Sequence, residues 1–528
     1  MSTTSSTTSG ELAGASEKSG FGTRKAFIFA AIGSAVGLGN IWRFPYVAYE
    51  GGGGAFLVPY LVALLLAGIP MLFLDYAMGH RYRGSAPLAF RRISKRGEWF
   101  GWWQVLITVV IGIYYPAIIA WAIRYTGFSV DKAWGSDPEA FLFGDFLRAA
   151  ETPGPTLDVV PGVLIPMVVV WAVTLGVLAL GVQAGIGRTA VIFIPALVIA
   201  FAILVVVALT LPGASVGLNA LFSPDWSALA EPGVWVSAFG QIFFSLSVGF
   251  GIMITYASYV GRKTDLTGSG AVVAFSNSSF ELLAGVGVFA VLGFLASSSG
   301  QPVDEVVAQG IGLAFVAFPA ILNEAPAGVL LGVLFFGSLV VAGLTSLISI
   351  VEVGISAIRD KTGAGRVAAT MIIGLPMAVV SCVLLGTTGG LYVLDTVDNF
   401  INSFGILLVA ALSMLAIGWV WRRLRPLADH MNVHSSIRLG AWWRVLVAVL
   451  VPLVLVVMLV LELVDNIETP YEGYPSSLLW TFGWGLVIAL PVIALLLARL
   501  PWQRGIELDD PGSDQLADDH ADTTGGAR

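Results

Sequence analysis

A glycine-rich segment near the N-terminus, GSAVGLGNIWRFP from Gly33 to Pro45, places polar residues inside an apolar stretch that starts near Ala26. Its glycines weaken a membrane helix, and Asn40 and Arg43 are costly to place in hydrocarbon. A helix broken at this depth must face protein or a watery cavity, and it exposes free carbonyls on one half and free N–H groups on the other. Such groups bind cations and anions, so the segment predicts a paired binding site. A helix-packing face would explain the glycines but not Asn40 and Arg43.

A second apolar stretch carries the same kind of interruption. Residues 241–251 read QIFFSLSVGFG, in which serines and glycines lie in the middle of an apolar run. Two interrupted segments at corresponding places in the two halves of a chain are typical of transporters built from inverted repeats, which bind their substrate near the membrane midplane. The halves share no residue-level similarity, so the repeat is predicted from this correspondence alone.

Other polar residues lie where they could contribute to such a site. Asn277 and Glu281 are one helical turn apart and face the same way, and a carboxylate within a membrane span is a functional candidate. Thr345 and Ser346 follow a glycine and a leucine, and adjacent hydroxyls suit a hard cation, although such hydroxyls often bond to their own backbone. Asp398 lies at the outer mouth of a later span, where it could pair with the arginine of the first segment.

The elements that must position these residues are predicted to be membrane helices. The 528 residues are 57% hydrophobic and 12% charged, a balance that excludes a soluble domain. Cys382 stands alone, the four histidines form no ligand pattern, and the intramembrane acids offer no nucleophile–base pair, so we expect no metal-binding histidine or cysteine cluster and no enzyme. The apolar runs predict an all-α polytopic membrane protein of about 12 transmembrane helices, with two inverted five-helix repeats and broken helices 1 and 6, at about 26–49, 55–79, 103–127, 161–181, 189–211, 235–260, 271–296, 327–357, 367–386, 392–421, 443–464 and 476–499.

The distribution of charge predicts the orientation of these helices. The loop after the second span, residues 81–96, is rich in arginine and lysine, whereas the loop 129–160 is acidic. Basic loops face the cytoplasm, so both termini are expected there, in a multi-pass protein of the cell membrane. We expect a cytoplasmic N-terminal tail (1–22), a transporter core (23–425) whose repeats are helices 1–5 and 6–10, helices 11 and 12 (426–500) and an acidic cytoplasmic C-terminal tail (501–528).

Together the motifs resemble those of the neurotransmitter:sodium symporter family, in particular its bacterial amino-acid transporters. The resemblance covers about 23–400, where GSAVGLGNIWRFP, GGGGAF, IYY, GQIFFSLSVGFG, TYASY and AGLTS occur in order. It implies sodium-coupled import of an amino acid by alternating access. The expected partners are thus a small amino-acid substrate, sodium and the lipid bilayer, and not a nucleic acid; the sequence predicts no particular oligomeric state.

The resemblance implies two sodium sites. One would be formed by the carbonyls of Gly33, Val36 and Ala342 and by the hydroxyls of Thr345 and Ser346. The other would share an oxygen of the substrate carboxylate and would be formed by the Ala35 carbonyl and the side chains of Asn40, Ser245 and Asn277. Oxygen ligands with little formal charge suit a sodium ion that must be released again.

The resemblance also implies where the substrate would lie. Its carboxylate would contact the N–H groups of Leu38 and Gly39 and the Tyr115 hydroxyl, and its amino group would contact carbonyls near Ala35, Phe244 and Ser247. Its side chain would be enclosed by Ile111, Phe244, Phe250, Ser349 and Ile350. This lining is mainly apolar, so a neutral, hydrophobic amino acid is expected. Ser34 stands where bacterial leucine transporters of the family have asparagine.

Two gates and a substitute for chloride follow from the same resemblance. Arg43 with Asp398 would form the extracellular gate, and Lys18 with Asp360, helped by Phe21 and Tyr259, would form the cytoplasmic gate. Glu281 replaces the small hydroxyl residue beside which chloride-dependent members bind their anion, near Tyr60, Gln241 and Ser245. Its carboxylate would supply the negative charge, so transport is expected to be chloride-independent; the alternative is a protonated Glu281 in a structural hydrogen bond.

Two other functions remain open on the same fold. A sodium-independent amino-acid exchanger would lack the paired hydroxyls of Thr345 and Ser346, which are present. A transport-dead amino-acid sensor would keep the binding site without moving the substrate across the membrane. Sodium-driven uptake into proteoliposomes separates these functions from symport.

Overall fold

Membrane-length helices make up most of the structure. The computed structural model describes residues 20–300, 303 and 310–510, and the regular elements within them are helices, without strands. Ten of these helices are long and apolar enough to cross a membrane, and the bent pair α1–α2 adds an eleventh. The ten are Gly54–Tyr82, Glu98–Phe128, Pro161–Ala179, Val182–Leu209, Leu266–Ser298, Gly328–Thr362, Arg366–Leu385, Gly390–Val420, Ala441–Gly473 and Ser476–Leu497. The helical membrane fold predicted from composition is confirmed.

The first interruption lies where the sequence predicts it. The helices α1 (Arg24–Ala35) and α2 (Leu38–Glu50) are inclined by 54° to each other, and the two residues between them have extended backbones. A Cβ atom on Gly37 would lie 3.0 Å from the Tyr115 hydroxyl oxygen, so glycine permits the close approach of this turn to α6 (Glu98–Asp131). The break therefore puts free backbone groups directly against a neighbouring span.

The second interruption divides the sixth predicted span. The helix α11 (Pro232–Ser245) ends before residues 246–251, which are not helical, and α12 (Ile252–Ser258) continues beyond them. Ser247 in this segment has a φ of 53°, a left-handed conformation that is uncommon outside glycine. With this pair, helices cover all twelve of the predicted spans. The inverted-repeat relationship between the halves stays a prediction.

A buried carboxylate holds the second unwound segment in place. Asp75 lies in α4 (Ile69–Tyr82) and is 2% exposed. Its side chain accepts a hydrogen bond of 3.0 Å from the backbone N–H of Gly249, whose φ is 85°. An unpaired backbone group is costly within a membrane, so Asp75 satisfies one donor that the break leaves free.

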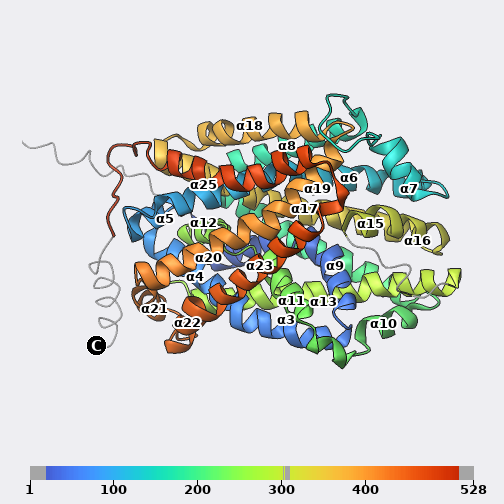
Figure 1. Cartoon of the computed structure of the whole chain (residues 1–528), viewed down its shortest axis with the longest axis horizontal. Helices are drawn as coiled ribbons and strands as arrows, with labels where there is room; N and C mark the ends of the chain where they lie inside the picture. The colour runs from blue at the N-terminus through green and yellow to red at the C-terminus, as the bar shows by residue number, and fades with distance from the viewer. Residues whose placement is uncertain (1–19, 301–302, 304–309, 511–528) are drawn as a thin grey trace, which may run out of the picture.

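Long helices enclose the two broken spans. The most extensive packing in the described structure joins α6 to α17 (Gly328–Thr362), and α17 also packs against α1, α2 and α12. The helices α13 (Leu266–Ser299) and α9 (Arg188–Leu209) contact α1 as well. Figure 1 shows these helices running along one another, with the broken spans among them. The breaks thus face protein rather than lipid.

Apolar side chains are exposed on the outermost helices. Valines, leucines and isoleucines of α18 (Arg366–Leu385), α23 (Val451–Glu468) and α25 (Gly485–Leu497) are among the exposed large hydrophobic residues. In Figure 1, α18 runs along the upper edge of the molecule. Helices with an apolar outer surface fit a lipid environment.

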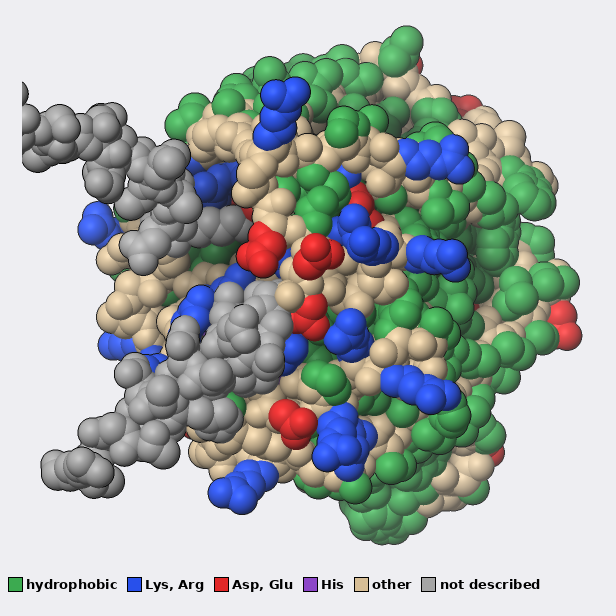
Figure 2. All heavy atoms as spheres, turned by 90° about the vertical axis from the view of Figure 1, so that its left-hand side faces the viewer, with side chains coloured by type: hydrophobic (Ala, Val, Ile, Leu, Met, Phe, Trp, Pro, Cys, Tyr) green, Lys and Arg blue, Asp and Glu red, His purple; other side chains and the backbone are tan. Residues whose placement is uncertain are grey.

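One end of the molecule is polar and rich in basic side chains. Figure 2 shows lysine and arginine side chains spread over this end, with apolar side chains towards its rim. In Figure 1 this is the left-hand side, where α5 (Ala86–Ile93) and α21 (Leu424–Asn432) lie. The basic loops that predict the cytoplasmic side therefore gather at one end. Its assignment to the cytoplasm stays a prediction.

Parts of both predicted tails lie against the helices. The Phe21 N–H donates to the Tyr259 carbonyl at 3.1 Å, and the Gln503 N–H donates to the Lys361 carbonyl at 2.9 Å. Residues 1–19 and 511–528 lie outside the described residues, and so does the predicted gate residue Lys18. The domain boundaries of the sequence analysis stay predictions.

Candidate substrate and ion sites

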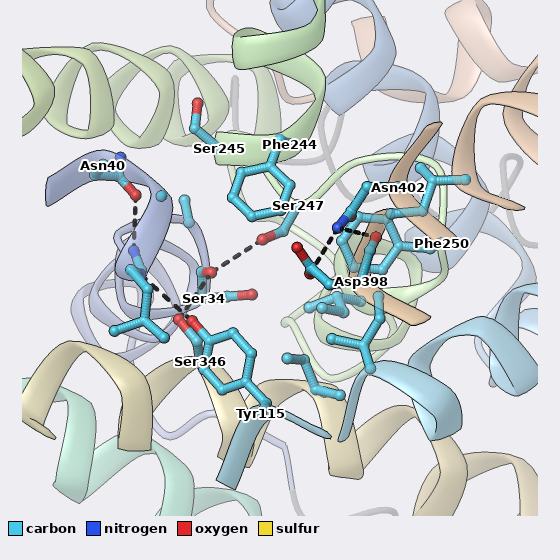
Figure 3. Close-up of a pocket in the computed structure, with 18 of the residues that line it drawn as sticks. Ser34, Asn40, Tyr115, Phe244, Ser245, Ser247, Phe250, Ser346, Asp398 and Asn402 are labelled. Atoms are coloured by element: carbon cyan, nitrogen blue, oxygen red, sulfur yellow. Dashed lines mark hydrogen bonds between the residues drawn. The ribbon is translucent and has the colours of Figure 1, made fainter. Parts of the chain in front are cut away.

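A cavity of about 90 Å³ lies between the two interruptions. Ten of the eleven residues predicted to bind the substrate line it: Ala35, Leu38, Gly39, Ile111, Tyr115, Phe244, Ser245, Ser247, Phe250 and Ile350. Figure 3 shows side chains from both broken spans pointing into this space. The lining also includes residues that the sequence analysis did not single out for the pocket, namely Tyr114, Ile118, Ile252, Asn402 and Ile406.

The remaining predicted lining residue, Ser349, does not line this cavity. Its hydroxyl accepts a hydrogen bond of 2.7 Å from Tyr256 and donates one of 3.0 Å to the Thr345 carbonyl. Ser349 is 1% exposed and is held between helices by these two bonds. In the described structure it therefore contributes to packing beside the site rather than to the pocket surface.

The start of α2 presents backbone N–H groups to one wall of the cavity. Leu38 and Gly39 are the first residues of this helix, so their N–H groups have no partner within it. The Leu38 N–H faces the Tyr115 hydroxyl oxygen at 3.4 Å. A Cβ atom on Gly39 would lie 2.1 Å from the Phe244 ring, so only glycine allows that ring to cover this wall. These groups suit a carboxylate.

Oxygen atoms of the first predicted sodium site gather where α1 ends. The Ser346 hydroxyl lies 3.3 Å from the Gly33 carbonyl and 3.4 Å from the Val36 carbonyl. The Thr345 hydroxyl lies 3.0 Å from the Ala342 carbonyl on the same helix, α17. Carbonyls at the end of a helix lack intrahelical partners, so the break leaves them available to a ligand. The donor set, neutral hard oxygens, fits sodium.

The side chains predicted for the second sodium site form a buried chain of hydrogen bonds. Asn40 donates to the Oδ1 atom of Asn277 at 2.8 Å, and Asn277 donates to the Ser245 hydroxyl at 3.0 Å. The Asn40 Oδ1 atom accepts from the Gly37 N–H at 2.8 Å. Asn40, Ser245 and Ala35 also line the cavity, so oxygen donors stand directly beside the place predicted for the substrate carboxylate.

Glu281, one helical turn after Asn277, is fully buried. Its carboxylate accepts hydrogen bonds from the Tyr60 hydroxyl and from the Gln241 side chain, the latter at 2.7 Å. Residues that the family resemblance places around a chloride ion therefore donate to a carboxylate here. Within the described residues, no group of three or more histidine, cysteine, aspartate or glutamate side chains could hold a metal ion.

The two residues of the predicted extracellular gate lie on one cavity wall without pairing. Asp398 accepts hydrogen bonds of 2.5 Å from Tyr114 and 2.8 Å from Asn402. The Arg43 guanidinium lies over the Phe244 ring, 5.2 Å from its centroid, and in the described structure no ion pair joins it to Asp398. Both residues line a second cavity of about 420 Å³, which shares the walls formed by Phe244, Asp398 and Asn402 with the first. The gate stays a prediction.

An ion pair that was not predicted from the sequence lies beside the predicted gate residue Tyr259. The Tyr259 hydroxyl donates to Glu352 at 2.6 Å, and Glu352 pairs with Arg366 at 2.6 Å. Asp360 accepts the Ser85 N–H at 2.8 Å, while its predicted partner Lys18 lies outside the described residues. The intramembrane position of Glu352 is the sequence signal that could have indicated this pair.

Comparisons with known proteins agree with this geometry. The model of the sodium:neurotransmitter symporter family matches residues 18–143 and 136–504. The chain is 40% identical to an uncharacterized sodium-dependent transporter of Methanocaldococcus jannaschii, over 93% of this chain and 99% of that protein. It is 29% identical to the mouse sodium- and chloride-dependent neutral and basic amino acid transporter B(0+), over 91% and 85% of the two chains, and 27% identical to the Caenorhabditis elegans sodium-dependent dopamine transporter, over 85% and 81%.

These matches cover most of the chain, including both broken spans, and the matched proteins are transporters rather than enzymes. The chain therefore belongs to the sodium:neurotransmitter symporter family and is a sodium-dependent membrane transporter.

Proposed function

We propose that this transporter imports a neutral amino acid together with sodium and without chloride. The observation that carries the proposal is the meeting of the two breaks around one cavity. The N–H groups of Leu38 and Gly39, which have no partner within α2, lie on one wall, and the oxygen ligands of Asn40 and Ser245 lie beside it. The N–H groups suit the carboxylate of a zwitterion, and the oxygen donors suit its accompanying cation. The basic end of the molecule would face the cytoplasm of a cell that carries the protein in its plasma membrane.

Sodium and substrate would be coupled through a shared ligand. An oxygen of the substrate carboxylate would complete the sodium shell formed by Asn40, Ser245 and Asn277, so each would raise the affinity for the other. With sodium at the Thr345–Ser346 site as well, two charges would cross the membrane with each zwitterion. At ~2.3 kcal/mol per charge per 100 mV, this contributes about 4.6 kcal/mol, enough for roughly a thousandfold accumulation.

Chloride independence is proposed from Glu281. Its buried carboxylate occupies the place between Tyr60 and Gln241, and a chloride ion beside it would be repelled. The mouse relative is named as chloride-dependent, so this property would separate the two proteins.

An amino acid fits the site better than an amine without a carboxylate. The C. elegans relative is named for dopamine, which has no carboxylate to meet the N–H wall of α2. A ligand of that kind would leave the Leu38 and Gly39 donors without a charged partner. The largely apolar lining, with Ile111, Phe250 and Ile350, further favours a neutral side chain over a charged one.

Reconstitution into proteoliposomes tests the proposal. Uptake of each labelled amino acid is measured with an inward sodium gradient and with a matched potassium gradient, in chloride and in gluconate. We expect uptake of neutral amino acids with sodium only, to the same extent in both anions. Equal uptake without sodium would indicate the exchanger, and binding without uptake would indicate the sensor.

A further inference from the structure

One hydroxyl facing the substrate cavity differs from the others. Ser34 is 4% exposed and lines the cavity, and its Oγ atom has no hydrogen-bond partner among the described residues. In Figure 3 its side chain points into the open space between Ser247 and Tyr115, towards Asp398. The backbone carbonyl of Ser34 is occupied, because it accepts the Ser247 hydroxyl at 2.9 Å.

The other hydroxyl groups of this cavity already have partners. The pairs are Tyr114 with Asp398, Tyr115 with the Leu38 N–H, Ser245 with Asn277, Ser247 with the Ser34 carbonyl, and Ser346 with the carbonyls of Gly33, Ser34 and Val36. A buried hydroxyl without a partner destabilises a protein unless a ligand or water pairs with it. Ser34 is therefore the lining hydroxyl that is free to recognise a polar group of the substrate.

The size of the cavity restricts what that substrate could be. Its volume of about 90 Å³ is smaller than the ~150 Å³ cavity that holds a benzene molecule in another protein. Gly39 lies tightly against the Phe244 ring, so the cavity cannot widen between them unless the ring moves. Threonine has more heavy atoms than benzene, so the site must widen to bind even a small amino acid, and a short side chain requires the least widening.

We propose that Ser34 is a specificity-determining residue, which hydrogen-bonds the side chain of the substrate and makes the transporter prefer small hydroxyl-bearing amino acids to their apolar isosteres. This inference rests on the proposed amino-acid transport. Among neutral amino acids, threonine fits these demands, because its methyl group can meet the apolar wall that includes Ile350 while its hydroxyl meets Ser34. A site whose buried polar group hydrogen-bonds a substrate hydroxyl binds an analogue without that hydroxyl less well, because the polar group is then left unpaired.

Threonine and valine test this inference because they have the same shape and differ in one hydroxyl. Sodium-driven uptake of L-threonine and L-valine is measured in proteoliposomes for the wild type, Ser34→Ala and Ser34→Cys. We expect the wild type to prefer threonine in kcat/KM, and Ser34→Ala to lower the threonine-to-valine ratio by at least about fivefold. Ser34→Cys, which keeps the size of the side chain but is a weak hydrogen-bonding group, is expected to lower the ratio as well.

A matched control is Ser381→Ala. Ser381 lies in α18, is fully buried and also has no hydroxyl partner among the described residues, but it does not line the cavity. We expect this variant to keep the wild-type ratio. The thermal midpoint of each purified variant identifies one that fails to fold, and if Ser34→Ala fails, Ser34→Cys decides the test.

The possible failures can be told apart. An unchanged ratio in the Ser34 variants, or an equal loss of threonine and valine uptake, would overturn the role of Ser34 in side-chain recognition while sodium-driven uptake continued. A wild type that imports valine as efficiently as threonine would also overturn this role. Absence of sodium-driven uptake for every amino acid would instead refute the proposed function.

Discussion

Asn40 and Asn277 are joined by a buried hydrogen bond of 2.8 Å between their side chains. This bond connects α2, the second half of the first broken span, to the long helix α13. Because Asn277 in turn donates to Ser245, the same chain reaches α11, where the second break begins. Three elements that are far apart in sequence therefore meet at one group of oxygen and amide atoms beside the cavity.

Removal of the Asn40 side chain should raise the sodium requirement of transport. Asn40→Ala deletes one oxygen of the proposed shared sodium site, and we expect the sodium concentration for half-maximal uptake to rise by about tenfold or more, equivalent to ~1.4 kcal/mol. Asn466→Ala is the control, because its amide bonds to the Glu462 carbonyl within α23, away from the cavity. Unchanged sodium dependence in Asn40→Ala would refute this ligand assignment.

Glu281 should decide the response to chloride. In Glu281→Ser the buried carboxylate between Tyr60 and Gln241 is replaced by a small hydroxyl, which makes room for an anion and removes the repulsion. Uptake by this variant is expected to require chloride and to be weak in gluconate. Glu281→Gln, which removes the charge without making room, should stay insensitive to chloride. Equal uptake by Glu281→Ser in the two anions would contradict the chloride-substitute role.

Loss of one partner of a buried ion pair at the basic end should strongly destabilise the protein. The Lys361 ammonium lies 2.5 Å from a carboxylate oxygen of Glu98, and these side chains are 4% and 6% exposed. The Trp502 indole also donates to Glu98, at 2.9 Å. Glu98→Gln leaves the lysine charge buried without its partner, which costs about 3–5 kcal/mol and should clearly lower the thermal midpoint of the purified protein.

An exposed ion pair offers the comparison. Arg24 lies 3.5 Å from Asp265, and its side chain is 48% exposed. Because water screens such a pair, Arg24→Gln should change stability by ~1 kcal/mol or less. Equal shifts of the thermal midpoint in Glu98→Gln and Arg24→Gln would show that the burial of the Glu98–Lys361 pair does not matter.

His430 should make the protein less stable in acid. Its ring lies 2.9 Å from a nitrogen of His80, and burial, with nearby positive charges, lowers the pKa of His430 to about 4. An unfolded histidine binds its proton below about pH 6.5, so between about pH 6.5 and about pH 4 the unfolded chain holds more protons and stability falls as the pH decreases. The thermal midpoint of His430→Gln should therefore fall less between pH 7 and pH 5 than the thermal midpoint of the wild type. An equal loss in both proteins would contradict this role.

The broken spans could be predicted because their causes are local. Glycines and polar side chains within an apolar run disfavour a continuous membrane helix whatever the rest of the fold does. The structure ends α1 at Ala35 and begins α2 at Leu38 accordingly. The ten predicted lining residues of the pocket lie on these two spans, on α17, which packs against both, or on α6, whose Tyr115 hydroxyl meets the Leu38 N–H.

The partners of individual side chains could not be predicted in the same way. Asp398 faces Arg43, Tyr114 and Asn402, and which of them bonds to its carboxylate depends on distances that only the tertiary packing sets. The family resemblance implies that Ser349 lines the pocket, but its oxygen accepts a hydrogen bond from the Tyr256 hydroxyl of α12 instead. The position of Tyr256 depends on the direction of α12, which is set by the non-helical residues 246–251 before it.

The most direct test of the central claim is a measurement of coupled flux. Radioactive sodium is added outside proteoliposomes that contain the wild type, held at a fixed membrane potential, and its uptake is followed with and without the amino acid that the protein transports. We predict that the amino acid accelerates sodium uptake and that Asn40→Ala weakens this acceleration at the same sodium concentration. Sodium uptake that is the same with and without the amino acid would contradict sodium-coupled transport through the site between the two broken spans.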